Sequence, residues 1–152
     1  MYSVFFDGLC EPKNPGGIAT FGFVVYDDAF FVDSGNGFVA RGRGASNNLA
    51  EYTALVRALE WLLDNNIRVC AVYGDSQLVI RQMSNVWAMR GGLYLPAYKR
   101  ARELTERFER LEFVWVPREM NAAADEQSRI AYENYCKVNG LVVRYHSNGK
   151  RE

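Results

Sequence analysis

The chain begins with apolar runs that have the length and composition of β-strands. Short runs of aromatic and β-branched residues stop at Asp7-Gly8 and at Pro117. Aspartate, glycine and proline commonly mark the ends of strands. Two longer β-rich runs meet at Asp27-Asp28, which predicts an antiparallel meander. Residues 9–17, dense in proline, glycine and asparagine, predict the turn before it. The predicted strands are 2–6, 18–28, 29–41, 68–74 and 112–117.

Later stretches show the spacing of apolar positions that is typical of amphipathic helices. The first of them is bounded by glycines before it and by Asn65-Asn66 after it, and Glu51 lies in line with its apolar stripe. Pro96 suits the first turn of a later helix, and Asn121 is a candidate N-cap of the last one. The predicted helices are about 47–64, 76–84, 96–111 and 121–138, and residues 85–95 are predicted to be an irregular aromatic loop.

This order of elements predicts a fold of the α/β class. Three strands in succession are followed by strands that alternate with helices, so we expect a mixed five-stranded sheet flanked by helices. Three antiparallel strands would come first and parallel strands would follow. Residues 140–146 are compatible with an extra edge strand, a packed tail or a dimer contact, and their alternation of Leu141, Val143 and Tyr145 does not decide among these.

Composition narrows the class of protein. A chain of 152 residues makes one domain, and its 18 Lys and Arg balance 18 Asp and Glu, which excludes a wholly basic nucleic-acid binder but not a local basic face. Cys10, Cys70 and Cys136 lack the spacing of a zinc site and indicate reduced buried thiols. No apolar run approaches the ~20 residues that span a membrane, and no signal peptide is recognisable. We therefore expect a cytoplasmic protein without a membrane partner.

The charge of Glu51 has three counterparts at comparable places. Asp7 and Asp75 follow apolar strands, and Asp125 lies early in the last predicted helix. In α/β sheets, sites form where strands end and helices begin, and four acids that converge there repel one another unless cations lie between them. Ligands that are all oxygens favour Mg²⁺ or Mn²⁺, and two such ions about 4 Å apart suit phosphodiester cleavage.

Each acid also has a plainer interpretation when it is taken alone. Asp7-Gly8 is typical of a turn, and Glu51 could be a charge that the helix dipole favours. Asp75 could cap a helix, and Asp125 could be a solvated helix residue. The hypothesis of a metal site therefore depends on the four acids occurring together in this order of elements.

Four motifs resemble type 1 ribonuclease H in their order and intervals: FFDGLCEPKNPGG, SNNLAEYTAL, YGDSQLVIRQM and WVPREMNAAADEQSRIA. The resemblance covers about residues 2–136 and implies a ribonuclease H domain at 1–139, with a C-terminal extension at 140–152. It implies that two Mg²⁺ or Mn²⁺ ions serve as cofactors. The metal ligands and catalytic residues that it implies are Asp7, Glu51, Asp75 and Asp125.

The same resemblance implies contacts with the substrate. Asn14, Asn47, Asn48 and Gln77 match positions that touch the minor groove of an RNA/DNA hybrid, and Ser46 matches a position that holds a DNA-strand phosphate. Side-chain amides can pair with a 2′-hydroxyl and with base-edge acceptors, so such contacts distinguish RNA from DNA without reading sequence. Helix capping is the alternative for Asn47 and Asn48.

Two departures place the chain nearer a shorter branch of the family. The loop before the last helix lacks the histidine that many members carry, and the one histidine, His146, is expected at the surface of the tail. Arg118 is expected to face a phosphate in its place, the alternative being an ion pair with Glu112, Glu119 or Glu126.

The second departure is the absence of a basic protrusion that helps other members to hold the hybrid. Its place is taken by residues 85–95. Trp87, Arg90 and Tyr94 would either stack on a nucleic-acid backbone or cover the core.

The resemblance implies a metal-dependent endoribonuclease that hydrolyses the RNA strand of RNA/DNA hybrids and leaves 3′-hydroxyl and 5′-phosphate ends. Double-stranded RNA is a further candidate substrate, and we expect a monomer. One alternative is a non-catalytic hybrid-binding domain of the same fold, against which the four acids argue. Another is a 3′-exonuclease or an integrase-like strand transferase, against which the compact length and the N-N-x-x-E helix start argue.

Overall fold

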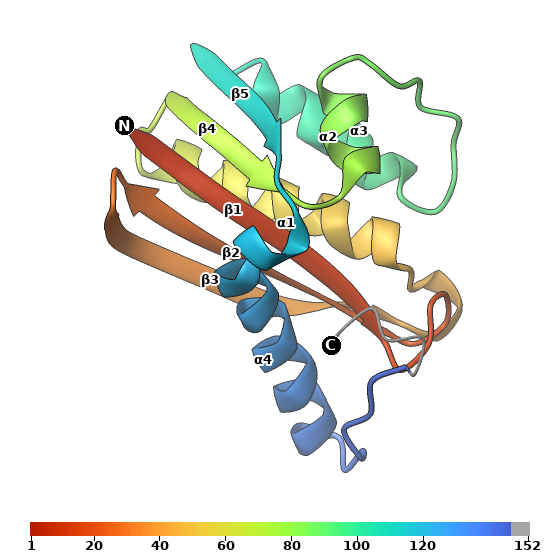
Figure 1. The fold of residues 1–152 in the computed structure, drawn as a ribbon. Coiled ribbons are helices and arrows are strands. Elements are labelled where there is room, and N and C mark those ends of the chain that lie inside the picture. The colour runs from red at the N-terminus through yellow and green to blue at the C-terminus, as the bar shows by residue number, and fades with distance from the viewer. Residues whose placement is uncertain (147–152) are drawn as a thin grey trace.

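The computed structural model describes residues 1–146, so residues 147–152 of the predicted extension lie outside the described part. Five strands form one mixed sheet in the order β3-β2-β1-β4-β5 (Figure 1). The first three strands are antiparallel, and β4 and β5 continue the sheet in parallel with β1, which confirms the predicted fold class. The strands are β1 (Tyr2–Glu11), β2 (Ile18–Asp27), β3 (Phe30–Arg41), β4 (Val69–Gly74) and β5 (Arg110–Trp115).

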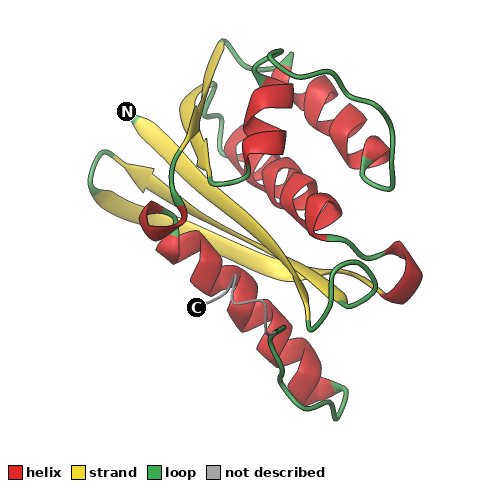
Figure 2. Cartoon of the chain, turned by 45° about the vertical axis from the view of Figure 1, so that its right-hand side comes forward, coloured by secondary structure: helices red, strands yellow, loops and turns green. Residues whose placement is uncertain are grey.

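Helices cover both faces of this sheet. Three of them pack on one face, and the last lies alone on the other, across β1, β2 and β3 (Figure 2). Within residues 1–146, no helix combines the length and the apolar character that crossing a membrane requires. The helices are α1 (Asn47–Asp64), α2 (Gln77–Met83), α3 (Leu95–Thr105) and α4 (Ala122–Val138), with short 3₁₀ helices η1 (Gly42–Gly44) and η2 (Arg118–Met120) before α1 and α4.

The two faces of the sheet contribute to separate cores. Phe6 and Val72 are fully buried beneath Leu59 of α1 in the main core. Leu9, two residues after Asp7, packs instead with Tyr132 of α4 in a smaller core on the opposite face. Strand β1 is therefore enclosed on both sides, and any charge along it lies in the interior of the molecule.

The first strand is longer than predicted. Residues 2–6 were expected to form a strand ending at Asp7, but β1 continues to Glu11, so that the turn spans only 12–17. Each residue of β1 pairs with β2, including Asp7 with Gly22 and Gly8 with Phe21. Aspartate and glycine disfavour strands when they stand alone, and here the continuous ladder to a long neighbour overrides that preference.

The predicted helix at 96–111 is too long at its C-terminal end. Helix α3 ends at Thr105, and Arg110 and Leu111 already belong to β5, where they pair with Val69 and Cys70 of β4. Over so short a stretch, helical spacing and strand alternation place apolar residues at overlapping positions, and pairing with β4 decides between them.

Residues 140–146, which we call the C-terminal segment, form no strand and pack as a tail against α4. Leu141 and Tyr145 lie against the core around Tyr132. The surface position predicted for His146 is wrong, because its side chain is 23% exposed and its ring contacts the fully buried carboxylate of Glu11. A buried carboxylate needs a polar partner, and the tail supplies one.

Candidate metal centre

The register between β1 and β4 brings the first two acids together. The parallel pairing of these strands runs from Ser3 with Ala71 to Phe6 with Gly74. Asp7 and Asp75 are each one residue beyond the last pair. They therefore occupy the carboxyl-end side of this pairing, where sites form in α/β sheets.

A glycine brings the third acid to the same place. A Cβ atom on Gly8 would lie 2.3 Å from the backbone carbon of Ala50 and 2.5 Å from the backbone nitrogen of Glu51. Only glycine permits so close an approach of strand and helix. The start of α1 thus rests directly on β1, and Glu51 lies beside Asp7.

The structure places carboxylate oxygens of Asp7, Glu51 and Asp75 within 4.8 Å of one another. Asp7 is 2% exposed and Glu51 is 4% exposed. Buried carboxylates at this spacing repel one another unless a cation lies between them. A set of ligands that are all oxygens suits a hard divalent ion. The residues present therefore fit a Mg²⁺ or Mn²⁺ ion.

The plainer interpretations of these three acids are wrong. Asp7 lies inside a strand rather than in a turn. Glu51 lies beyond the first turn of α1 and is buried, so it is not an exposed charge at a helix end. Helix α2 is capped by Ser76, whose hydroxyl accepts the backbone N–H of Val79 at 3.2 Å, and not by Asp75.

Asp125 is not part of the group of three. It lies in the first turn of α4, where its Oδ2 accepts a hydrogen bond from Nε of Arg129 at 2.8 Å. The two side chains are 19% and 25% exposed, so Asp125 is not the solvated helix residue that the plainer interpretation describes. Helix α4 crosses β2 closely at Gly22, the pairing partner of Asp7, where a Cβ atom would lie 2.5 Å from the backbone nitrogen of Ser128.

Sequence reasoning missed the roles of two side chains that arrange this region. Asn121 precedes α4 as predicted, but its side chain caps nothing; its amide instead donates to the carbonyl of Phe6 at 2.9 Å. Arg129 was not singled out, although its spacing of one helical turn from Asp125 is a signal that could have identified the pair.

The start of α1 holds several predicted substrate contacts. Ser46 is the N-cap, and its hydroxyl accepts the backbone N–H of Leu49 at 3.1 Å. The side chain of Asn14 accepts the backbone N–H of Asn47 at 2.9 Å and ties the β1–β2 loop to this helix. Capping by Asn47 or Asn48 is therefore wrong. Within residues 1–146 neither of these two side chains makes a hydrogen bond to the protein.

Gln77 and Arg118 lie at the starts of other elements near the acids. Gln77 is the first residue of α2, immediately after Asp75-Ser76, and its side chain accepts a long contact of 3.5 Å from Arg81. Arg118 is exposed in η2, and in the described part of the chain it forms no ion pair with Glu112, Glu119 or Glu126. The ion-pair alternative for Arg118 is therefore wrong.

The loop at 85–95 places one of its aromatic residues against the core and another at the surface. Tyr94 stacks on Tyr52, with ring centres 5.4 Å apart, and packs against the main core. Trp87 is exposed, and the guanidinium of Arg81 lies 5.6 Å from its ring. Arg90 and Trp87 line a cavity of about 400 Å³ at the surface.

Comparisons with known proteins place this fold in a family. A family model described as "Reverse transcriptase-like" matches residues 5–131. The crystal structure of RNase H1 from the halophilic archaeon Halobacterium salinarum superimposes with a TM-score of 0.80 at 33% identity, covering 88% of this chain and 98% of that chain. The chain belongs to the type 1 ribonuclease H family. LC11-RNase H1 in complex with an RNA/DNA hybrid is 28% identical, with a TM-score of 0.80, covering 89% of this chain and 99% of that chain.

One of the relatives is a much longer protein. The bifunctional protein Rv2228c of Mycobacterium tuberculosis is 35% identical over 120 residues, which is 79% of this chain but 32% of that protein. This ribonuclease H family member thus spans about a third of that relative.

Proposed function

We propose that this chain is a metal-dependent endoribonuclease that hydrolyses the RNA strand of RNA/DNA hybrids and leaves 3′-hydroxyl and 5′-phosphate ends. The observation that carries the proposal is the group formed by Asp7, Glu51 and Asp75, whose oxygens lie within 4.8 Å of one another. Membership of the ribonuclease H family and similarity to a hybrid-bound relative support it.

In this proposal the four acids hold two divalent ions, Mg²⁺ or Mn²⁺. Asp7, Glu51 and Asp75 are already grouped, and Asp125 joins them from the start of α4. When bound, such a pair of ions supplies an activated water and stabilises the oxygen that leaves the phosphorus. The rigid support of each carboxylate by a strand or helix keeps the oxygens in place, which limits the reorganisation needed at the site.

Recognition of the hybrid falls to the start of α1 and the loop beside it. The side chains of Asn47 and Asn48 offer amide donors and acceptors that suit a 2′-hydroxyl and base edges in a wide minor groove. Asn14 and Gln77 extend this polar surface, and Ser46 is proposed to contact a DNA-strand phosphate. The side-chain oxygen of Asn14 already accepts the backbone N–H of Asn47, so we assign its amide nitrogen to the contact with the substrate.

Arg118 is proposed to face the phosphate of the product. Its guanidinium is exposed and makes no ion pair in the described residues, so it is available to a substrate anion. Because it lies just before α4 and Asp125, it occupies the part of the chain where other family members carry a histidine.

Three further features belong to the same proposal. The protein is expected to act as a monomer and in the cytoplasm, and Cys10, Cys70 and Cys136, all buried free thiols, are compatible with a reducing compartment. Double-stranded RNA is a second candidate substrate, because it shares the A-form minor groove with 2′-hydroxyls.

The test is cleavage of an end-labelled RNA/DNA hybrid with Mg²⁺, with Mn²⁺ or with EDTA, beside single-stranded RNA, double-stranded RNA and double-stranded DNA. Hybrids with blocked ends separate an endonuclease from an exonuclease. Metal-dependent internal cuts in the RNA strand would support the proposal, provided that Asp7→Asn gives none. Hybrid binding without cleavage in any metal would instead indicate a non-catalytic binding domain.

A further inference from the structure

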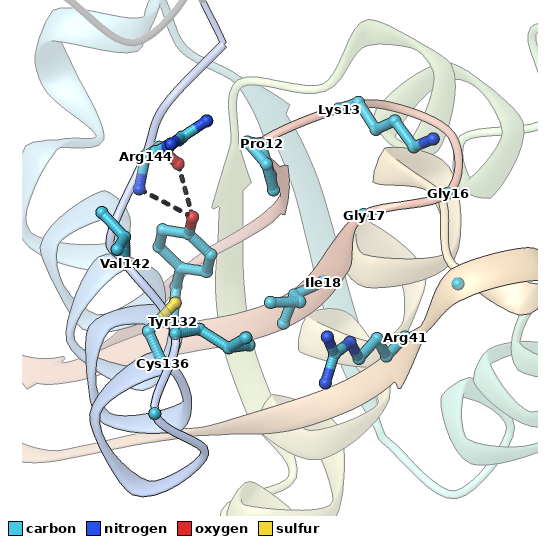
Figure 3. A pocket seen from close by; sticks show the side chains of 13 residues that line it. Pro12, Lys13, Gly16, Gly17, Ile18, Arg41, Tyr132, Cys136, Val142 and Arg144 are labelled. Carbon is cyan, nitrogen blue, oxygen red and sulfur yellow. Dashed lines mark hydrogen bonds between the residues drawn. The ribbon is translucent and has the colours of Figure 1, made fainter.

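The C-terminal segment is fixed to the body of the molecule at two points. The hydroxyl of Tyr132 in α4 donates to the carbonyl of Arg144 and accepts its backbone N–H at 3.1 Å (Figure 3). One residue beyond Tyr145, the backbone N–H of His146 donates to Oε1 of Glu11 at 2.8 Å, and the imidazole contacts the same oxygen. Tyr145 lies between these two anchors, so its backbone is held in place on both sides.

Tyr145 makes three different contacts with α4. The guanidinium of Arg129 lies 4.8 Å from the centre of its ring, within the range of a cation–π interaction. Its hydroxyl donates to Oε2 of Glu133 at 2.8 Å. The ring also meets Tyr132 edge-on, with ring centres 5.2 Å apart.

Arg129 connects Tyr145 to the candidate metal centre. Its Nε donates to Oδ2 of Asp125 at 2.8 Å, one helical turn earlier. Glu133 lies one turn later, so Arg129 has a carboxylate at i−4 and another at i+4. The hydroxyl of Tyr145 binds the carboxylate of Glu133, which leaves that carboxylate less available to Arg129. The ring of Tyr145 packs on the guanidinium of Arg129. Both contacts favour the orientation in which Arg129 faces Asp125.

We infer that Tyr145 is a positioning residue, which acts through Arg129 to hold the carboxylate of Asp125 in the orientation that binds metal. The inference rests on the proposed function, because it takes Asp125 as a ligand. It assigns a role in the active site to the C-terminal segment, which lies outside the residues matched by the family model. Residues that hydrogen-bond to a metal ligand commonly increase affinity for the ion by orienting that ligand.

The test compares two tyrosines that make the same kind of contact. Tyr135 of α4 stacks on Phe38 and carries the guanidinium of Arg41 at 5.9 Å from its ring, but that pair does not lead to Asp125. Mn²⁺ binding is measured by titration calorimetry in the absence of substrate. Losing a direct partner of a metal ligand commonly costs about tenfold or more in affinity, and Tyr145 acts one step further out, so we expect Tyr145→Leu to weaken Mn²⁺ affinity by up to about tenfold, with Tyr135→Leu unchanged.

A double-mutant cycle shows whether Tyr145 acts through Arg129. If it does, Tyr145→Leu added to Arg129→Gln lowers Mn²⁺ affinity no further than Arg129→Gln alone, because the contact of residue 129 with Asp125 is already lost. Tyr145→Phe, which keeps the ring and releases Glu133, should show a smaller loss, and adding Glu133→Gln should restore affinity. The same Tyr145→Phe series serves if Tyr145→Leu does not fold by circular dichroism.

Four outcomes would overturn the inference. These are unchanged Mn²⁺ affinity in Tyr145→Leu, tighter affinity in it, an equal loss in Tyr135→Leu, or effects of Tyr145 and Arg129 that simply multiply. Failure of the proposed function is distinguished by the wild type and Asp7→Asn. If the wild type binds no Mn²⁺, both proposals are wrong. If the wild type binds Mn²⁺ and Asp7→Asn does not, the proposed metal centre is supported, whatever the effect of replacing Tyr145.

Discussion

The side-chain amide of Asn121 donates a hydrogen bond of 2.9 Å to the backbone carbonyl of Phe6, the residue before Asp7. Asn121 is fully buried, and it immediately precedes α4, which carries Asp125. One side chain therefore joins the strand that holds the first acid to the helix that holds the last. Their relative position depends on this contact as well as on packing.

Replacing Asn121 by Ala should disturb both stability and activity. The carbonyl of Phe6 would lose its side-chain partner in the interior, which costs about 1–3 kcal/mol of unfolding free energy. Hybrid cleavage should fall with little change in KM, because Asp125 would be less well placed. Denaturant unfolding and steady-state kinetics measure the two effects. Asn139→Ala is the matched control, since Asn139 donates at 2.8 Å to the carbonyl of Tyr135 at the exposed end of the same helix. Equal losses in both variants would contradict the assignment.

Neutralising Asp7 should abolish cleavage without harming the fold. Asp7 is buried beside Glu51 and Asp75, so Asp7→Asn removes repulsion in the metal-free protein. We expect its midpoint of thermal unfolding without metal to equal or exceed that of the wild type. Added Mg²⁺ should then raise the midpoint of the wild type but not that of the variant, since only a state that binds the ion is stabilised by it. The exposed Asp64→Asn serves as the control. Near-full activity in Asp7→Asn would refute the metal centre.

The sequence was sufficient to predict the fold class and that Asp7, Glu51 and Asp75 lie together, but not how these acids are held. Asp7, Glu51 and Asp75 are recognisable because they interrupt apolar patterns at strand ends and on a helix stripe, and such interruptions are rare in a core. Arg129 and Asn121 interrupt nothing. A buried amide that bonds to a distant carbonyl has the same local sequence pattern as a helix cap, so the pattern around Asn121 predicts a cap.

Element boundaries were predicted less well than element types. The predicted first strand ends at Asp7, whereas β1 continues to Glu11. Its pairing with β2 beyond Asp7 is a tertiary contact that the local sequence does not signal. The role of His146 was missed for a similar reason: its partner Glu11 is 135 residues away, and no local spacing signals the pair.

Adding one methyl group at Gly8 should separate Glu51 from Asp7. A Cβ there would lie 2.3 Å from the backbone of Ala50, which no side-chain rotation can relieve. We expect Gly8→Ala to lose about 1–3 kcal/mol of unfolding free energy or more and to bind Mn²⁺ more weakly. Gly44→Ala is the control, because nothing lies within 4 Å of a Cβ at that position. Calorimetric titration and denaturant unfolding report both quantities, and Gly8→Ala with unchanged Mn²⁺ affinity would contradict this account of the site.

Removing the guanidinium of Arg118 should slow turnover less than removing an acid. Arg118 is exposed and makes no ion pair in the described residues, so Arg118→Ala should leave the unfolding free energy unchanged within about 0.5 kcal/mol. If it assists departure of the phosphate, steady-state turnover falls while the first turnover stays fast. Burst kinetics on a hybrid separate these steps. A loss as large as that of Asp7→Asn would mean that Arg118 takes part in the chemical step.

The buried thiol of Cys70 should make the protein less stable in alkaline solution. Burial raises the pKa of Cys70 from 9.0 to about 12 in the folded chain. Between these values the folded state keeps a proton that the unfolded state releases, so the unfolding free energy is undiminished below pH 9 and falls as the pH rises above it. Denaturant unfolding from pH 8 to pH 10 should show this slope. Cys70→Ala should reduce the slope without removing it, because burial also raises the pKa of Cys10. Since the smaller side chain also lowers stability at every pH, the slopes are compared and not the absolute values. An unaltered slope in Cys70→Ala would show that other groups account for the alkaline loss.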